Sequence, residues 1–254
     1  YMYAGQQVVV LTDNGEVPGI IGYLPNMDKG IQAQDLILDL GCQTEEEAKQ
    51  LVRCGNPVMV DRKYTYLANN FFSGKALDDK LAAYIFLEAI KKVKGKTNLG
   101  IYLATTVGEE TTGRGAHVAV QKVKPTCAIT MDVTYAACIN YRENLLNDVY
   151  LGKGAVLTEG SLMNKVMHKQ FLDICKEKQI PYQIETAPSR TYTDTDSMYT
   201  YFEGVPCYLL SIPLRYMHSS VEVCNFNDVD NLIDLVAEYI LQFDPNKSFN
   251  PFEE

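Results

Sequence analysis

The sequence lacks several features that would point to other classes of protein. None of its 254 residues is tryptophan and only three are histidine. No run of about 18 apolar residues occurs, so we expect no membrane-spanning helix. The first residues, YMYAGQQVVV, show neither the basic segment nor the apolar core of a secretory signal. Basic residues are outnumbered, with 23 Lys and Arg against 32 Asp and Glu, and a net charge of −9 argues against nucleic-acid binding because phosphates would be repelled.

Paired cysteines are also missing. The seven cysteines are an odd number, are scattered along the chain and form no CxxC motif. Such a distribution is typical of reduced thiols, so we expect a cytoplasmic protein.

Two regions with different patterns follow one another. Residues 1–72 contain short β-type runs separated by turn signals, and one helix announced by the capping box of Thr44 and Glu47. The expected strands cover residues 7–12, 19–24, 35–40 and 57–62. We therefore expect a small β-rich domain over residues 1–72.

Residues 73–254 alternate amphipathic and apolar segments. The expected helices cover residues 79–93, 115–123, 164–179, 196–203 and 227–243, the last with Asn227 as its N-cap. The expected strands cover residues 98–105, 126–132, 181–186 and 206–212. This alternation predicts an α/β domain with a largely parallel sheet over residues 73–254.

Acidic residues and one histidine lie where a ligand site of such a sheet is expected, beyond the carboxyl ends of the strands. They are Asp78 and Asp79 at the start of the first helix, Glu109 and Glu110 after the first strand, Asp132 at the end of the second, and His218 after the last. Each has an ordinary alternative explanation as a helix cap, a solvated loop, a turn or a structural histidine. Their joint placement favours a metal centre, because carboxylates mixed with imidazole suit Zn, Mn or Co.

Spaced motifs in one order resemble the M42 family of metallo-aminopeptidases, which includes glutamyl and deblocking aminopeptidases and members once labelled endoglucanase or cellulase M. The motifs are GKALDDK at 74–80, TTVGEETTGRGA at 105–116, ITMDVT at 129–134, TDTDS at 193–197 and SIPLRYMHSSVEV at 211–223. Segments 19–27 and 36–48 resemble the family's inserted β-rich domain. The resemblance implies a three-layer α/β/α metallopeptidase domain of the phosphorylase/hydrolase-like type with a smaller β-rich insertion.

The resemblance also implies roles for individual residues. Asp78 resembles the carboxylate that bridges two metals, Glu110 and His218 resemble ligands of the first metal, and Asp132 resembles a ligand of the second. Glu109 resembles the general base, and Asp79 the catalytic residue that follows the bridging carboxylate. Substrate contacts are expected from Arg215, Tyr216, Thr195 and Asp196, although a buried salt bridge for Arg215 and a turn or cap role for Asp196 remain alternatives.

One family feature is absent. Family members carry an early histidine, usually in an H-x-D context, that binds the second metal, whereas this chain has only His117, His168 and His218, none of them in that context. We expect one complete site for Zn or Co, with Mn as an alternative, and a weak or empty second position. A start at Tyr1 rather than Met favours a truncated chain, the alternative being a protein that works with one metal or none.

The leading prediction is a metal-dependent aminopeptidase that acts on peptides and assembles as a homo-oligomer, from dimer to dodecamer. The alternative from another class is a catalytically silent or truncated homologue that acts in assembly or binding. A related deacylase or carboxypeptidase of the same clan is a third possibility. The retained acids and His218 favour the enzyme, and the lack of a tryptophan sugar platform argues against a cellulase.

Overall fold

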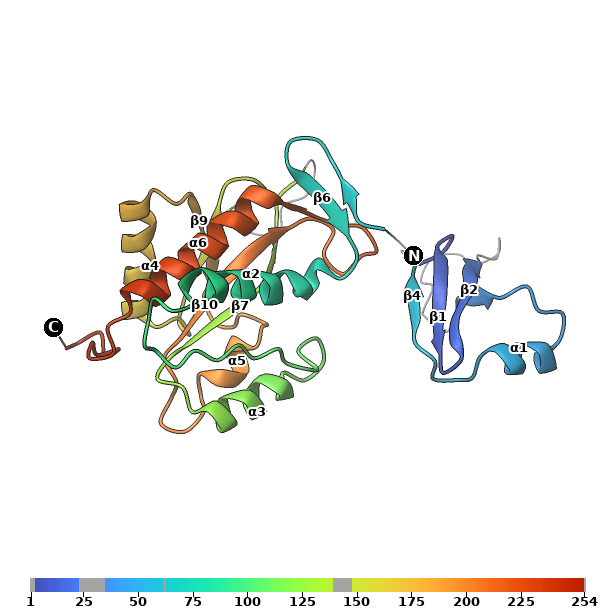
Figure 1. Cartoon of the computed structure of the whole chain (residues 1–254), viewed down its shortest axis with the longest axis horizontal. Helices are drawn as coiled ribbons and strands as arrows, with labels where there is room; N and C mark the ends of the chain where they lie inside the picture. The colour runs from blue at the N-terminus through green and yellow to red at the C-terminus, as the bar shows by residue number, and fades with distance from the viewer. Residues whose placement is uncertain (1–2, 23–34, 62, 139–147, 254) are drawn as a thin grey trace.

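The computed structural model describes residues 3–22, 35–61, 63–138 and 148–253. Figure 1 shows a small β-rich unit near the N-terminus and a larger unit in which helices cover a sheet. None of the helices in the described ranges combines the length and apolarity that a membrane-spanning helix needs.

The β-rich unit is a four-stranded antiparallel sheet in the order β3-β2-β1-β4. Its strands are β1 (Gln7–Thr12), β2 (Gly15–Gly22), β3 (Ile37–Asp39) and β4 (Val58–Val60). All four were expected, and the expected residues 23, 24 and 62 lie outside the described residues. Helix α1 (Glu45–Leu51) begins as predicted, because the Thr44 side chain accepts a hydrogen bond from the Glu47 backbone N–H at 3.2 Å.

The central sheet of the larger unit has the order β7-β10-β8-β9. Its strands are β7 (Ala128–Tyr135), β8 (Ala155–Gly160), β9 (Tyr182–Ala187) and β10 (Cys207–Leu214). The pairs β7–β10 and β8–β9 are parallel and the β10–β8 pair is antiparallel, so the largely parallel sheet is confirmed. Strand β8 was not predicted. Every residue of β10 is buried, as expected for a strand covered on both faces.

Helices lie on both sides of this sheet and complete the three-layer α/β/α architecture (Figure 1). The helices are α2 (Leu77–Val93), α3 (Arg114–Val123), α4 (Lys165–Lys178), α5 (Thr195–Met198) and α6 (Phe226–Gln242). Helix α6 contacts α2 and α4, while α3 and α5 contact each other on the other side. Two expectations need correction: α5 is shorter than residues 196–203, and the cap of α6 is Asn225, whose side chain accepts from the Asn227 N–H.

The expected buried strand at residues 98–105 is wrong. The segment is irregular, and Ile101, Tyr102 and Leu103 are 37%, 72% and 39% exposed. An apolar run becomes a buried strand only when a neighbouring strand supplies backbone hydrogen bonds and cover. Within the described residues no strand pairs with this segment, and β7 is the edge of the central sheet. Glu109 and Glu110 therefore follow an irregular segment rather than a strand.

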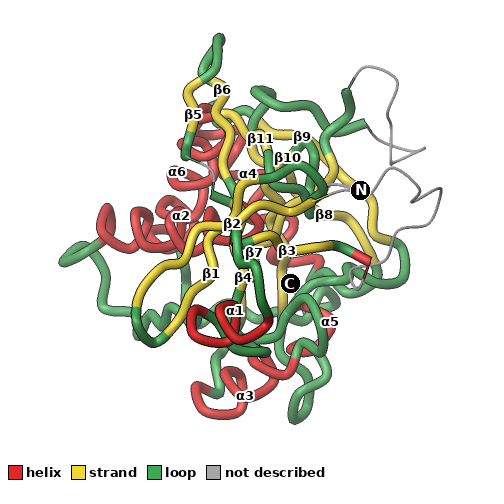
Figure 2. Tube along the Cα trace, turned by 90° about the vertical axis from the view of Figure 1, so that its right-hand side faces the viewer, coloured by secondary structure: helices red, strands yellow, loops and turns green. Residues whose placement is uncertain are grey.

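A second small sheet brings distant parts of the chain together. Strands β5 (Thr65–Tyr66), β6 (Phe71–Gly74) and β11 (Glu222–Asn225) pair in the order β11-β6-β5, and the β5–β6 hairpin projects at the top of Figure 2. None of these strands was predicted. Glu222 lies opposite Gly74 in the ladder, which places the loop before β11 beside the start of α2. The expected domain boundary between residues 72 and 73 stays a prediction.

Candidate metal centre

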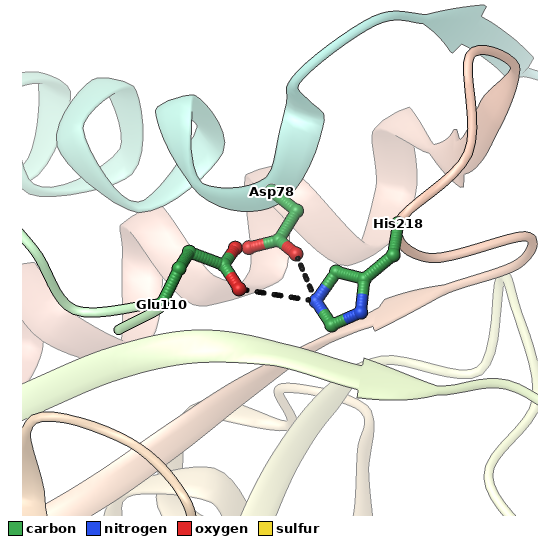
Figure 3. Close-up of side chains that lie close together, drawn as sticks. All are labelled: Asp78, Glu110 and His218. Carbon is green, nitrogen blue, oxygen red and sulfur yellow. Dashed lines mark ion pairs between the residues drawn. The ribbon is translucent and has the colours of Figure 1, made fainter. Parts of the chain in front are cut away.

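Asp78, Glu110 and His218 form one cluster of side chains (Figure 3). His218 Nε2 lies 3.1 Å from Asp78 Oδ2 and 3.3 Å from Glu110 Oε2. One ligand atom from each residue lies within 4.8 Å of those of the other two. The Asp78 side chain is 7% exposed, whereas Glu110 and His218 are 57% and 56% exposed. The cluster therefore has a buried floor and a side open to solvent.

The three ligand residues lie where the backbone is irregular. The first turn of α2 is not helical at Asp78 (φ −79°, ψ 110°) or Asp79 (φ −121°, ψ 63°), and the peptide bond between them is cis. His218 adopts a left-handed conformation with φ 59°. Glu110 lies within a tight turn that starts at Gly108 (φ 73°), whose carbonyl oxygen accepts hydrogen bonds from the backbone N–H groups of residues 111–113. The ligand atoms thus come from three separate segments: the start of α2, the turn at Gly108 and the loop at His218.

Asp79 and Asp78 are consecutive but do different things. Asp79 Oδ1 accepts a hydrogen bond from the Ala82 N–H at 2.9 Å, so Asp79 caps the regular part of α2. Asp78 faces Glu110 and His218 instead. The cap explanation thus applies to Asp79 and not to Asp78.

The carboxyl groups around the cluster have raised pKa values, so they ionise less readily than usual. Burial, Glu110 and Glu222 raise the pKa of Asp78 to about 6, against the lowering effect of His218. Burial, Asp194 and other carboxylates raise the pKa of Glu109 to about 7. Burial is also the main cause that raises the pKa of Asp79 to about 8 and that of Asp132 to about 9. These acids share too little positive charge to ionise together, which is the deficit that a divalent cation corrects.

The donor set fits such a cation. Two carboxylates and one imidazole provide three ligands of the types found in catalytic zinc sites, which keep a further position for water or substrate. The same oxygen and nitrogen donors also accept Co or Mn. The ligand atoms are already gathered, so little rearrangement of the side chains is needed.

Asp132 is not part of the three-residue cluster, but the charge of Asp79 contributes to its raised pKa. It is the fifth residue of β7 rather than the end of a strand, because β7 continues to Tyr135. Its Oδ1 accepts a hydrogen bond from the neighbouring Val133 N–H at 2.8 Å.

The expected substrate residues have unequal access to solvent. Tyr216 is 55% exposed, whereas Thr195 is fully buried and its hydroxyl contacts the hydroxyls of Thr130 and Thr193. Arg215 places its guanidinium 5.6 Å from the centre of the Phe71 ring.

Asp196 organises its own loop. It accepts hydrogen bonds from the Thr191 N–H, the Thr191 hydroxyl and the Tyr192 N–H. Burial alone would raise its pKa, but these bonds and the one from Arg190 lower it. These contacts match the turn role that the sequence left open for Asp196.

Two further acids lie near the cluster: Asp194, which stands in the TDTDS motif but was assigned no role from the sequence, and Glu222, which was not singled out. Glu222 is 2% exposed and its carboxylate accepts hydrogen bonds from the backbone of both Asp78 and His218. Asp194 accepts a hydrogen bond from the Thr106 hydroxyl, and its other oxygen is buried without a hydrogen-bond partner. Glu222 lies within the motif at 211–223, four residues after His218, but an acid at that spacing is too common a pattern to single it out.

Comparisons with known proteins find relatives over most of this chain. The family model described as M42 glutamyl aminopeptidase matches residues 1–235. The lysyl aminopeptidase of Pyrococcus furiosus is 35% identical over 250 residues, which cover 94% of this chain and 71% of that protein.

Solved structures give the same result. A TET aminopeptidase from a marine sediment archaeon of the Thaumarchaeota has a TM-score of 0.84 at 30% identity, over 96% of this chain and 72% of that one. An aminopeptidase from Desulfurococcus kamchatkensis has a TM-score of 0.88 at 28% identity, over 96% and 70%. The TET1 peptidase of Pyrococcus horikoshii, which assembles into a tetrahedron or an octahedral shell, has a TM-score of 0.76 at 25% identity, over 95% and 73%. The chain belongs to the M42 glutamyl aminopeptidase family.

Proposed function

We propose that this protein is a metal-dependent aminopeptidase that hydrolyses the first peptide bond of peptides. The observation that carries the proposal is the Asp78–Glu110–His218 cluster with Glu109 beside it, in a chain of the M42 family. The three residues would hold one divalent ion, for which Zn and Co are the first candidates and Mn the next. When bound, such an ion polarises the scissile carbonyl and lowers the pKa of a coordinated water.

Glu109 is the proposed general base. It takes a proton from the attacking water and returns it to the amine nitrogen as the C–N bond breaks. Its carboxyl is half-buried, and the neighbouring carboxylates Asp194, Glu110 and Asp78 add to burial in raising its pKa to about 7. A base with a pKa near the working pH both accepts and releases the proton readily.

The remaining roles follow from position. Asp79 holds the start of α2 through its bond to Ala82, and so supports the neighbouring Asp78. Asp132 is the proposed carboxylate of a second, weaker metal position shared with Asp78. Arg215 and Tyr216 precede His218 in the same loop and are the proposed contacts to the peptide.

Thr195 and Asp196 contribute indirectly to substrate binding. Their contacts brace the loop that carries Asp194, and Asp194 is an electrostatic neighbour of Glu109. We assign them the role of keeping this loop in place beside the base.

We also propose that residues 1–72 form the smaller assembly domain and residues 73–254 the catalytic domain. The β-rich unit exposes four large apolar side chains, Ile20, Ile37, Val58 and Met59. Exposed apolar surface of this kind often marks a contact with another subunit. Together with the assembly of the Pyrococcus horikoshii TET1 peptidase, this supports a homo-oligomer, for which we propose a size between a dimer and a dodecamer. We place the protein in the cytoplasm.

The test is hydrolysis of a panel of aminoacyl anilides with added Zn or Co, and with a chelator as control. Chelator-sensitive turnover supports the aminopeptidase, and the preferred anilide identifies the residue specificity. Glu109→Gln should lower turnover by about 10²–10⁴-fold while leaving the metal bound, because only the base is lost. Unchanged turnover would show that Glu109 is not the base. Metal binding without turnover of any anilide would favour the catalytically silent homologue.

A further inference from the structure

Glu222 connects two of the three segments that form the cluster. One carboxylate oxygen, Oε2, accepts hydrogen bonds from the backbone N–H of Leu77 at 2.7 Å and of Asp78 at 3.2 Å. The other oxygen, Oε1, accepts from the backbone N–H of His218 at 3.2 Å. Leu77 and Asp78 lie 145 and 144 residues away from Glu222 in sequence. One side chain thus joins the start of α2 to the His218 loop.

The three donors have no alternative helix partner. The N–H groups at the beginning of a helix lack an intrahelical acceptor, and the irregular first turn of α2 leaves those of Leu77 and Asp78 in this position. The His218 N–H belongs to a loop with left-handed residues at Tyr216 and His218, so it has no ladder partner either. A buried N–H without an acceptor is costly. Glu222 therefore satisfies donors of both segments in one place.

The surrounding strands hold Glu222 in position. It is 2% exposed and lies opposite Gly74 in the β6–β11 ladder. The base of the His218 loop is closed by the backbone pair Arg215–Val223, with N–H to oxygen distances of 2.9 and 3.0 Å. Two oxygens of one rigidly held carboxylate consequently set the backbone positions from which the Asp78 and His218 side chains extend.

We propose that Glu222 is a positioning residue that holds Asp78 and His218 at the spacing required to bind one divalent ion. The inference rests on the proposed function, because it assigns a role to Glu222 at the same site. Glu222 is not placed to bind the ion itself, since both of its oxygens accept from backbone N–H groups. Its effect is on the preorganisation of the ligands.

The test compares Zn²⁺ affinity by isothermal titration calorimetry in the wild-type chain and in Glu222→Gln. The amide keeps one acceptor oxygen but turns an NH₂ group toward the donors of the other segment, so the link is broken on one side. We expect the dissociation constant for Zn²⁺ to rise by about 10–100-fold, the size typical of residues that orient metal ligands. The absorption spectrum of bound Co²⁺ should change as well, because the ligand geometry changes.

Asp228→Asn is the matched control. Asp228 is also a fully buried carboxyl that accepts from backbone N–H groups, those of Gly152 at 2.6 Å and Gly154 at 2.7 Å, but it does not touch the cluster. We expect the Zn²⁺ affinity of Asp228→Asn to stay within about 2-fold of the wild-type value, even if its stability changes. At about 1.4 kcal/mol per tenfold change in affinity, this is a difference of less than about 0.5 kcal/mol. Circular dichroism on all variants checks that the fold is retained.

Glu222→Asp covers the case in which Glu222→Gln does not fold. It keeps the charge but removes one methylene, so the carboxylate no longer spans both segments, and Zn²⁺ affinity should fall in the same direction. Wild-type affinity and an unchanged Co²⁺ spectrum in either folded Glu222 variant would overturn the inference and leave the proposed function intact. A wild-type chain that binds no Zn²⁺ would overturn both.

Discussion

Gly115 in the first turn of α3 is a sensitive point, because the loop leading to Glu109 and Glu110 lies directly against it. A Cβ atom at Gly115 would lie 2.4 Å from the Val107 carbonyl oxygen and 2.5 Å from the Val107 nitrogen. Ordinary van der Waals contact begins at 3.4 Å, so the added methyl is short of space by about 1 Å. Both obstructing atoms are backbone, so a side-chain rotation cannot relieve the clash.

Two effects of Gly115→Ala oppose each other in stability. Alanine is favoured over glycine in a helix by about 1 kcal/mol, whereas forcing an extra methyl into a packed site costs about 1–3 kcal/mol. The net change in unfolding free energy is therefore a destabilisation of at most about 2 kcal/mol. The effect on activity is larger. The clash can be relieved only if the backbone of Val107, two residues before Glu109, shifts by about 1 Å. Misplacing a catalytic group by this much can cost about 10²-fold.

The assay is the kcat/KM for the preferred aminoacyl anilide, measured with saturating metal. We expect Gly115→Ala to lower it by about 10²-fold, while thermal unfolding shows that the protein remains folded. Gly100→Ala is the control, because its Cβ would meet only Tyr102 at an ordinary 3.7 Å, and it should leave both activity and stability unchanged. Wild-type kcat/KM in Gly115→Ala would refute the argument that contact with α3 sets the position of Glu109.

Three further predictions concern ligation, packing and pH. His218→Ala should weaken Zn²⁺ binding by more than the roughly 10–100-fold typical of outer residues, because it removes one of three ligands, and equilibrium dialysis measures this. Phe171→Ala should lower the unfolding free energy in urea by about 3–5 kcal/mol, since Phe171 is fully buried and stacks on Tyr208 at 4.7 Å and Tyr239 at 4.3 Å. Burial raises the pKa of Asp228 from 3.8 to about 6, so the folded state binds its proton more tightly than the unfolded state. Relative to Asp228→Asn, the wild-type chain should lose stability as pH rises from about 4 to 6, by an order of 3 kcal/mol, and a flat difference would contradict this pKa.

Much of the fold could be predicted because it depends on local patterns. Amphipathic spacing predicted α2, α4 and α6, and continuous apolar runs predicted β7 and β10. Thr44 and Glu47 marked the start of α1 because a capping box involves neighbouring residues only. The placement of particular acids and of His218 along the chain, likewise a property of the sequence itself, directed attention to a metal site with acidic ligands.

The pairing of distant segments could not be predicted. Residues 98–105 have the composition of a buried strand, but whether such a run becomes one depends on a partner strand elsewhere in space. Strands β5, β6 and β11 are two to four residues long, too short to show a period of their own. They form because their backbones meet in tertiary contact.

The candidate site divides in the same way. The sequence by itself determined which residues are chemically able to bind a metal, and the order of the motifs singled out Asp78, Glu110 and His218. The bond of Asp79 to Ala82 is a local helix cap, an alternative that the sequence had left open, whereas only the tertiary structure decided that Glu222 joins Asp78 to His218. The physical reason is that a side chain's chemistry is a local property, whereas the hydrogen-bond donors it meets are supplied by the folding of the whole chain.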